Sequence, residues 1–211
     1  MSGIIDLSHS ICSNIPTYPG DRPIPKVESI SKNGITITSI RLGSHMGTHI
    51  DAPRHFSPNG KSLGDISPET FIGSAVCLDK SDTQNEINIA ADELDVLARL
   101  RPKWLFIFTG HDKFWGQERY FSNHPYASKI MIRELLKTRI AGIGVDTPSI
   151  DAADAGNDGY PNHHLWLGAG RLAIENLCGL YQLPTKTAIE IYALPLNIDA
   201  DGAPVRVLVK L

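Results

Sequence analysis

The pattern of hydrophobic and polar positions predicts alternating helices and strands in the middle of the chain. Apolar residues recur at helical spacing over residues 89–100 and again over 127–139. A short apolar run follows each of these segments, over 103–110 and 140–147, and such runs are typical of strands. Repeated helix-then-strand order predicts a mixed α/β domain.

Residues 34–45 follow a different pattern. Ile35 and Ile37 alternate with threonines, and then the phase changes so that Ile40 and Leu42 become the apolar pair. A strand with one extra residue would produce this change, so the pattern predicts a bulged strand. This strand would lead directly into a group of histidines.

The remaining segments predict a proline-rich loop, a third helix and strands near both ends of the chain. They are a short strand starting within 3–11, the loop 15–25, the glycine-containing helix 167–183, and strands 187–198 and 205–211 joined by a turn at 199–204. No repeat or low-complexity linker divides the chain. We therefore expect one domain over 1–211.

Composition and charge restrict the classes of partner. The chain has 211 residues, a hydrophobic fraction of 42% and a formal net charge of -3, with acids and bases interleaved. These values predict a compact core and a small-molecule partner, and they argue against nucleic acid. No basic leader precedes a long apolar stretch and no run approaches a membrane span, so we expect no membrane association. The three widely separated cysteines, without a CxxC pair, favour a reducing, cytoplasmic location.

The stretch HMGTHIDAPRH at residues 45–55 concentrates potential metal ligands. It contains His45, His49, Asp51 and His55. On an extended chain, positions 45, 49 and 51 point the same way, and Gly47 leaves the space between the histidines open. The pattern therefore predicts that two imidazoles and one carboxylate converge, with His55 returning toward them.

Two imidazoles and a carboxylate form a ligand set suited to Zn²⁺, Mn²⁺ or Fe²⁺. Three protein ligands would leave coordination positions open for water, as catalytic sites do. A metal-binding protein without catalysis is the alternative from another class. His55 favours catalysis, because a structural site is closed by its ligands and needs no additional base.

These residues resemble the HxGTHxDxPxH signature of the cyclase family of metal-dependent hydrolases, which includes bacterial kynurenine formamidases and isatin hydrolases. The segments YPGD, TGHDKFW, GVDTPSID and HH followed by IENL occur in the order that this family shows. The resemblance implies a single mixed α/β domain of the swivelling β/β/α type. It also implies an arylformamidase that converts N-formylkynurenine to kynurenine and formate in tryptophan catabolism. The alternative within the family is hydrolysis of a cyclic amide such as isatin, or of another small amide or ester.

The resemblance also implies a role for each candidate residue and one or two divalent metals per chain, with Zn²⁺ first and Mn²⁺ second. His45, His49 and Asp51 would hold the first metal, and His55 would act as acid and base. His163 and Glu175 would hold a second metal, with Asp51 and Glu175 bridging. His164 is the alternative to His163, since adjacent residues are hard to distinguish from sequence. The implied assembly is a homodimer or homotetramer, with the loop 15–25 as a lid or cross-subunit arm.

Two residues of this set raise separate questions. Glu175 has Leu172, Ile174 and Leu177 as neighbours, which predicts a largely apolar helix where an unpaired carboxylate would be costly. A cation would relieve this cost, whereas the alternative is an exposed position on the polar face. Tyr18 stands where the formamidases carry tryptophan, so it would form a smaller aromatic wall of the substrate pocket.

The other polar candidates are assigned lesser roles. Asp146 either orients a ligand histidine or forms a turn at a strand end. The residues expected to be structural or in loops are Asp151, Asp154, His9, His111 and His124. The cysteines Cys12, Cys77 and Cys178 are expected to pack as small hydrophobic side chains.

Overall fold

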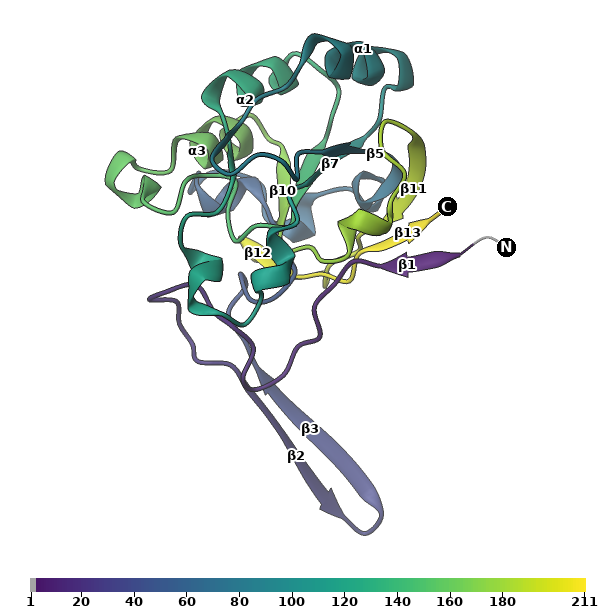
Figure 1. The fold of residues 1–211 in the computed structure, drawn as a ribbon. Helices are drawn as coiled ribbons and strands as arrows, with labels where there is room; N and C mark the ends of the chain where they lie inside the picture. Colours follow the sequence, from purple (N-terminus) through teal and green to yellow (C-terminus); the bar gives the residue numbers. More distant parts are fainter. Residues whose placement is uncertain (1–2) are drawn as a thin grey trace.

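A nine-stranded mixed sheet forms the centre of the computed structural model, which describes residues 3–211 (Figure 1). Four strands in the middle run parallel to one another, in the order β5 (Ile72–Asp79), β7 (Trp104–Phe108), β9 (Gly142–Val145) and β10 (Leu172–Glu175). Parallel neighbours of this kind need crossover connections, and the helices supply them.

Antiparallel strands extend the sheet on both sides of this parallel centre. Beyond β5 lie β11 (Ala188–Tyr192), β13 (Leu208–Lys210) and β1 (Ile4–Asp6). Beyond β10 lie β4 (His49–Asp51) and β12 (Gly202–Pro204). The two predicted terminal strands therefore pair with each other, whereas the turn predicted between them contains the edge strand β12.

Three helices cover one face of the sheet (Figure 1). They are α1 (Ala91–Leu100), α2 (Lys129–Leu136) and α3 (Pro161–Gly168). The hydroxyl of Ser128 caps α2 by accepting from the backbone N–H of Met131. No helix within residues 3–211 combines the length and the hydropathy that crossing a bilayer requires.

Both faces of the central sheet are buried. In β5, Val76 and Leu78 pack into the core beneath the helices, whereas Ala75 and Cys77 pack into a second core. This second core includes apolar residues from β11 and β13, because the sheet curls. Burial on both sides explains why these strands are almost continuously apolar in sequence.

Short elements complete the fold. Two-residue strands pair in parallel as β6 (Glu86–Ile87) and β8 (Tyr126–Ala127). Single turns of 3-10 helix lie at η1 (Pro53–His55), η2 (Leu63–Asp65), η3 (Pro68–Phe71), η4 (His111–Phe114), η5 (Glu118–Phe121), η6 (Ala155–Asp158) and η7 (Leu180–Gln182).

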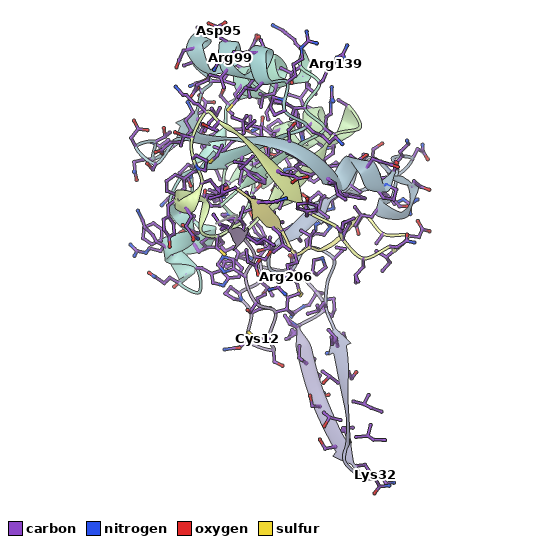
Figure 2. All side chains as sticks on the ribbon, turned by 90° about the vertical axis from the view of Figure 1, so that its right-hand side faces the viewer. Cys12, Lys32, Asp95, Arg99, Arg139 and Arg206 are labelled. Atoms are coloured by element: carbon purple, nitrogen blue, oxygen red, sulfur yellow. The ribbon has the colours of Figure 1, made fainter. Side chains whose placement is uncertain are left out.

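A two-stranded hairpin projects from the body of the molecule (Figures 1 and 2). It consists of β2 (Lys26–Lys32) and β3 (Ile35–Arg41), whose register is unbroken from the Lys26–Arg41 pair to the Lys32–Ile35 pair. The bulge predicted in this segment is therefore wrong. The apolar phase changes because both faces of the hairpin are exposed, so no single face has to stay apolar.

The helix predicted over 167–183 is also wrong. Helix α3 ends at Gly168, a turn with Gly170 at φ +78° follows, and the chain then enters β10. The four residues of β10 are all buried, and so short an apolar run has no periodicity that separates strand from helix. The helices predicted at 89–100 and 127–139 and the strands at 103–110 and 140–147 are confirmed.

Gly144 lies where the central sheet leaves no room for a side chain. A β-carbon there would lie 2.6 Å from Cδ1 of Phe106 and 2.8 Å from Cδ1 of Leu177. Gly144→Ala should lower the free energy of unfolding by about 1–3 kcal/mol, measured by urea denaturation, because overpacked cores must shift. Gly168→Ala is the matched control, since a β-carbon there would meet no atom within 4 Å beyond its chain neighbours and its own helix backbone, and it should change stability by less than about 1 kcal/mol. Equal losses in the two variants would contradict this packing constraint.

Candidate active site

Strand β4 brings together residues that are far apart in the sequence. It pairs antiparallel with β10 on one side, which places His49 opposite Glu175, and with β12 on the other, which places Gly202 opposite Asp51. His49 and Asp51 are two residues apart on one strand, so their side chains share a face. Glycine is required at 202, because a β-carbon there would lie 2.7 Å from Cε1 of His45.

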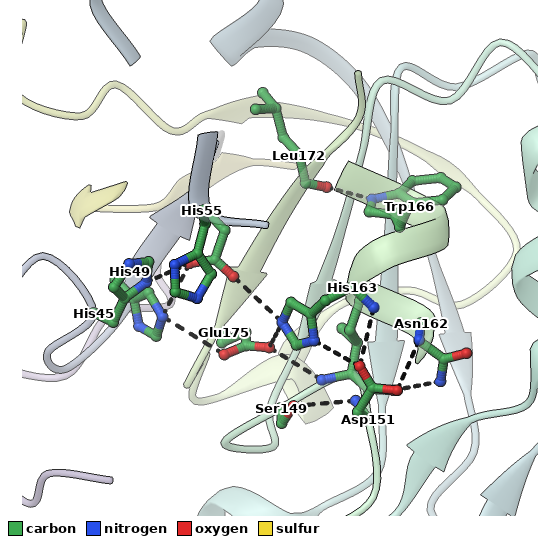
Figure 3. Close-up of polar contacts among 12 residues, drawn as sticks. His45, His49, His55, Ser149, Asp151, Asn162, His163, Trp166, Leu172 and Glu175 are labelled. Carbon is green, nitrogen blue, oxygen red and sulfur yellow. Dashed lines mark hydrogen bonds and ion pairs between the residues drawn. The ribbon is translucent and has the colours of Figure 1, made fainter. Parts of the chain in front are cut away.

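His163 reaches the same place from helix α3 (Figure 3). The indole of Trp166 donates to the Leu172 carbonyl at 2.7 Å and so fastens this helix to β10. His163 Nε2 lies 3.1 Å from Glu175 Oε1 and 3.6 Å from Asp51 Oδ2. Glu175 is thus at the buried end of a strand, and the helix expected to carry it is absent.

The carboxylate of Asp51 lies between two groups of side chains. Its Oδ1 is 2.7 Å from His45 Nδ1 and 3.3 Å from His49 Nε2, whereas its Oδ2 faces His163. His45, His49 and Asp51 form one set of donors with ligand atoms within 4.8 Å of one another, and Asp51, His163 and Glu175 form another. The predicted residues therefore converge, with His163 rather than the exposed His164 in the cluster.

Each of the three clustered imidazoles uses its second ring nitrogen for an outer hydrogen bond. Histidine ligands of metals are usually held in this way, because the outer bond fixes the tautomer and the ring orientation. The bonds are His45 Nε2 to Asp201 Oδ2 at 2.8 Å, His49 Nδ1 to the Gly47 carbonyl at 2.9 Å, and His163 Nδ1 to Asp151 Oδ2 at 2.7 Å.

Sequence reasoning missed the two carboxylates that hold these rings. Asp151 does lie in a loop, but it is buried and also accepts from the backbone N–H groups of Asn162 and His163 at the start of α3. Asp201 belongs to the segment interpreted as a turn. Only the pairing of β12 with β4 brings Asp201 beside His45, and no local sequence pattern predicts that contact.

The extended backbone expected over 45–51 is only partly present. Regular strand covers His49–Asp51, and His45 lies in a preceding turn. Gly47 has φ +65°, and a β-carbon there would lie 2.7 Å from Cδ1 of Ile15. Glycine is therefore needed for the backbone conformation and the contact with Ile15, which differs from the open space between ligands that the sequence suggested.

His55 lies beside this cluster in the short helix η1. Its ring stacks on His45 with 3.8 Å between centroids, and its Nδ1 lies 3.2 Å from Asp201 Oδ2. It belongs to neither donor set that contains Asp51, although it forms a third, more exposed set of possible donors with His45 and Asp201. His55 is partly exposed to the adjoining cavity, which leaves it accessible to a bound molecule.

The buried carboxylates of Asp51 and Glu175 require compensating positive charge. Burial lowers the pKa of His45, but Asp51 and Asp201 outweigh this effect and raise it to about 10. The pKa of His163 shifts for the same reasons. Burial lowers it, and the carboxylates of Asp151, Asp51 and Glu175 outweigh this effect and raise it above its usual value. Charged imidazoles or a cation can supply this charge. The mixed nitrogen and oxygen donors fit a divalent transition metal.

A cavity of about 280 Å³ opens beside the cluster. Its aromatic walls include Tyr18, Phe56, Phe121 and Tyr160. Tyr18 meets Phe121 edge to face, with 5.9 Å between ring centroids. Burial, followed by the neighbouring Tyr160, raises the pKa of Tyr18 to about 12, so its phenol is protonated at neutral pH. The cavity therefore suits a flat, largely apolar molecule that presents a polar group to the cluster.

The other residues assigned lesser roles make no contact with the metal-ligand cluster. Asp146 accepts from Thr109 and from the backbone N–H of Gly110, so it organises a turn. His9 stacks on Trp115, and His111 and His124 contact backbone carbonyls. Cys77 is packed in the core and Cys178 is partly buried, whereas Cys12 is exposed, contrary to expectation.

Comparison with known proteins identifies the family of this chain. Residues 5–152 match the family model described as "Putative cyclase". The chain belongs to the cyclase family. The kynurenine formamidase of Geobacillus thermodenitrificans is 32% identical over 100% of this chain and 98% of the relative, and that of Bacillus cereus strain ATCC 14579 is 31% identical over 98% and 96%.

Solved structures of cyclase-family proteins share the fold. Isatin hydrolase A from Labrenzia aggregata, bound to benzyl benzoate, superposes with a TM-score of 0.84 at 27% identity and covers 100% of this chain and 94% of that one. A structure described as a predicted metal-dependent hydrolase from Bacillus stearothermophilus gives a TM-score of 0.79 at 25% identity and covers 100% of this chain and 98% of that one. The mixed α/β fold and the family expected from the signature are confirmed.

A divalent cation should stabilise this cyclase-family protein. Zn²⁺ added to chelator-treated protein at a hundredfold excess over its dissociation constant adds about 2.7 kcal/mol. This should raise the Tm by at least about 5 °C, since 1 kcal/mol corresponds to about 2–4 °C at this chain length. Asp51→Asn should lose most of the shift, measured by scanning calorimetry, because it removes charge from both donor sets. Asp154→Asn, at an exposed position, should keep the shift, and an equal loss there would contradict the assignment.

Proposed function

We propose that this protein is a metal-dependent amide hydrolase of the arylformamidase type, which cleaves N-formylkynurenine to kynurenine and formate in tryptophan catabolism. The observation that carries this proposal is the pair of largely buried donor sets sharing Asp51, beside a cavity with aromatic walls. The similarity to kynurenine formamidases over nearly the whole chain supports it.

The donor sets assign the ligands in this proposal. His45, His49 and Asp51 would hold one metal, and Asp51, His163 and Glu175 a second. Zn²⁺ is the first choice and Mn²⁺ the second, with one or two ions per chain, because imidazole and carboxylate suit both. When bound, the cation supplies Lewis acidity that polarises the scissile carbonyl and lowers the pKa of water.

His55 carries the proton transfers. Its Nδ1–H donates to Asp201, which leaves Nε2 free for proton exchange at the cavity. It takes a proton from the water that attacks the formyl carbon and returns one to the departing aryl amine, because an imidazole exchanges protons in both directions near neutral pH. Asp201 holds the ring in this orientation.

The aromatic cavity determines the class of substrate. Tyr18, Phe121 and Tyr160 offer ring faces and edges to an aryl group. The structural similarity to isatin hydrolases favours a cyclic amide as the second candidate substrate. A metal-binding protein without catalysis is less well supported, because His55 lies outside both Asp51 donor sets and at a cavity.

We further propose that the protein acts in the cytoplasm as a homodimer or homotetramer. Its three cysteines are free thiols, as a reducing compartment favours. Ile30, Ile35 and Ile37 lie on one face of the projecting hairpin and are 74%, 65% and 71% exposed. An apolar face of this kind fits burial against a second copy of the chain.

If His55 transfers protons and does not hold the metal, replacing it should lower turnover without changing the metal content. His55→Ala should lower kcat by about 10²-fold or more, the usual effect of losing a positioned proton-transfer group. The metal content, measured by elemental analysis, should be unchanged. His164→Ala is the matched control, since His164 is exposed and outside the cluster, and it should keep full activity. Near-normal turnover by metal-loaded His55→Ala would remove this residue from the mechanism.

A comparison of substrates tests the proposed activity directly. The metal-loaded protein should hydrolyse N-formylkynurenine with higher kcat/KM than isatin. Tyr18→Trp should lower KM more than it changes kcat, because stacking acts equally on the bound substrate and the transition state. Tyr181→Trp, at a residue 70% exposed, should change neither constant. If no formyl aryl amine is turned over, the arylformamidase assignment fails and the cyclic-amide candidate replaces it.

The exposed isoleucines of the hairpin lead to a prediction about the oligomeric state. Sedimentation velocity should show a dimer or tetramer for the natural chain, and the double change Ile30→Ser, Ile37→Ser should shift it toward the monomer. The control is Ser29→Ala, Thr38→Ala, a cross-strand pair on the opposite face of the hairpin. An unchanged assembly in the isoleucine variant would show that subunits associate elsewhere.

A further inference from the structure

A buried tyrosine and asparagine connect the cavity wall to His49. We propose that Tyr120 and Asn176 are positioning residues that fix the ring orientation and tautomer of His49, so that its Nε2 faces the acidic cluster. The inference rests on the proposed function in one respect, namely that His49 is a metal ligand. It assigns a role to two residues that the ligand sets do not contain.

Both backbone polar groups of Asn176 make hydrogen bonds to other segments of the chain. It follows Glu175 at the end of β10 and adopts φ +58°. Its N–H donates to the Thr147 carbonyl at 3.0 Å, and its carbonyl accepts from the Thr48 hydroxyl at 2.6 Å. The second bond connects the end of β10 to Thr48, the residue that precedes His49. The backbone position from which the Asn176 side chain extends is therefore held in place relative to His49.

The side-chain amide of Asn176 can satisfy its neighbours in only one orientation. Its Nδ2 donates to the Gly47 carbonyl at 2.9 Å, and its Oδ1 accepts from the Tyr120 hydroxyl at 2.9 Å. A rotated amide would point an oxygen at the Gly47 carbonyl, which has no proton to give. The carbonyl and the hydroxyl together therefore hold the amide in place.

His49 shares the same carbonyl acceptor. Its Nδ1 lies 2.9 Å from the Gly47 oxygen and 3.3 Å from Asn176 Nδ2, which already donates to that oxygen. The Gly47 oxygen can only accept, so its 2.9 Å contact with Nδ1 is a hydrogen bond only when Nδ1 carries a proton. The second N–H of Asn176 Nδ2 then makes no bond to His49, and Asn176 acts on the ring by holding the shared Gly47 carbonyl. The unprotonated Nε2 then faces Asp51 Oδ1 at 3.3 Å and Glu175 Oε2 at 3.6 Å, as a metal ligand requires.

Tyr120 is a rigid support for this amide. It is fully buried in η5, with Trp115 edge-on at 5.0 Å between ring centroids. Its backbone carbonyl contacts His111 Nε2 at 2.9 Å. The next residue, Phe121, lines the cavity, so one short segment supports both the substrate wall and the orientation of His49.

The test measures metal affinity and stability separately. Tyr120→Phe removes only the hydroxyl, and Asn176→Gly removes the amide while suiting the left-handed backbone. Each variant should bind Zn²⁺ about 10-fold or more weakly by chelator competition, within the usual range for lost outer hydrogen bonds. The double variant should be no weaker than Asn176→Gly alone, because Tyr120 acts through Asn176. Tyr181→Phe is the exposed control and should bind as the natural chain does.

A second measurement follows the proton on His49 directly. In the zinc-loaded protein, the Nδ1 proton of His49 should exchange with solvent faster in Asn176→Gly than in the natural chain, as observed by NMR. This variant keeps the test available if Tyr120→Phe does not fold. An unchanged zinc dissociation constant and exchange rate, with only a lower Tm of the metal-free protein, would show a purely structural role and overturn the proposal.

The outcomes also separate this proposal from the proposed function. If His49→Ala loses zinc while the Tyr120 and Asn176 variants bind normally, the positioning role fails and the metal assignment stands. Additive losses in the double variant would show that Tyr120 acts independently of Asn176, and would also overturn the proposal. A natural chain that binds no divalent cation would overturn both.

Discussion

The candidate site depends on strand β4 being paired on both sides. Its three residues carry His49 and Asp51, and its neighbours β10 and β12 bring Glu175 and the segment of Asp201 alongside. Backbone hydrogen bonds set this register, so the separation of the side chains follows from the sheet. A slip of one residue would turn His49 and Asp51 to the opposite face and disperse the cluster.

The surroundings of the cluster are organised to hold charged groups away from water. Asp51 and Glu175 are almost fully buried, which is favourable only beside positive charge and hydrogen-bond donors. The outer acceptors for the three rings come from a loop, a backbone carbonyl and the bend that precedes the edge strand β12. Because each acceptor belongs to a different part of the sheet or its connections, the geometry of the site depends on the whole fold.

The spacing of residues predicts the local part of this site, the family resemblance supplied the distant His163 and Glu175, and neither indicated the outer contacts of Asp151 and Asp201. His45, His49, Asp51 and His55 fall within eleven residues, and their spacing alone indicated a shared centre. Their contact with Asp201 depends on an edge strand too short to have a periodicity of its own. The strand that carries Glu175 resembled a helix for a similar reason, because four buried residues between turns fit either structure.

The hairpin β2–β3 has two open edges, since in the described chain each of its strands pairs only with the other. Open edges invite strand addition, which can continue without limit and lead to aggregation. Charged residues flank the exposed isoleucines on the same face, namely Lys26, Glu28, Lys32 and Arg41, with Lys32 at the tip in Figure 2. Stacking many hairpins edge to edge would place like charges in rows. The arrangement therefore permits a closed association of a few copies and opposes an open-ended fibre.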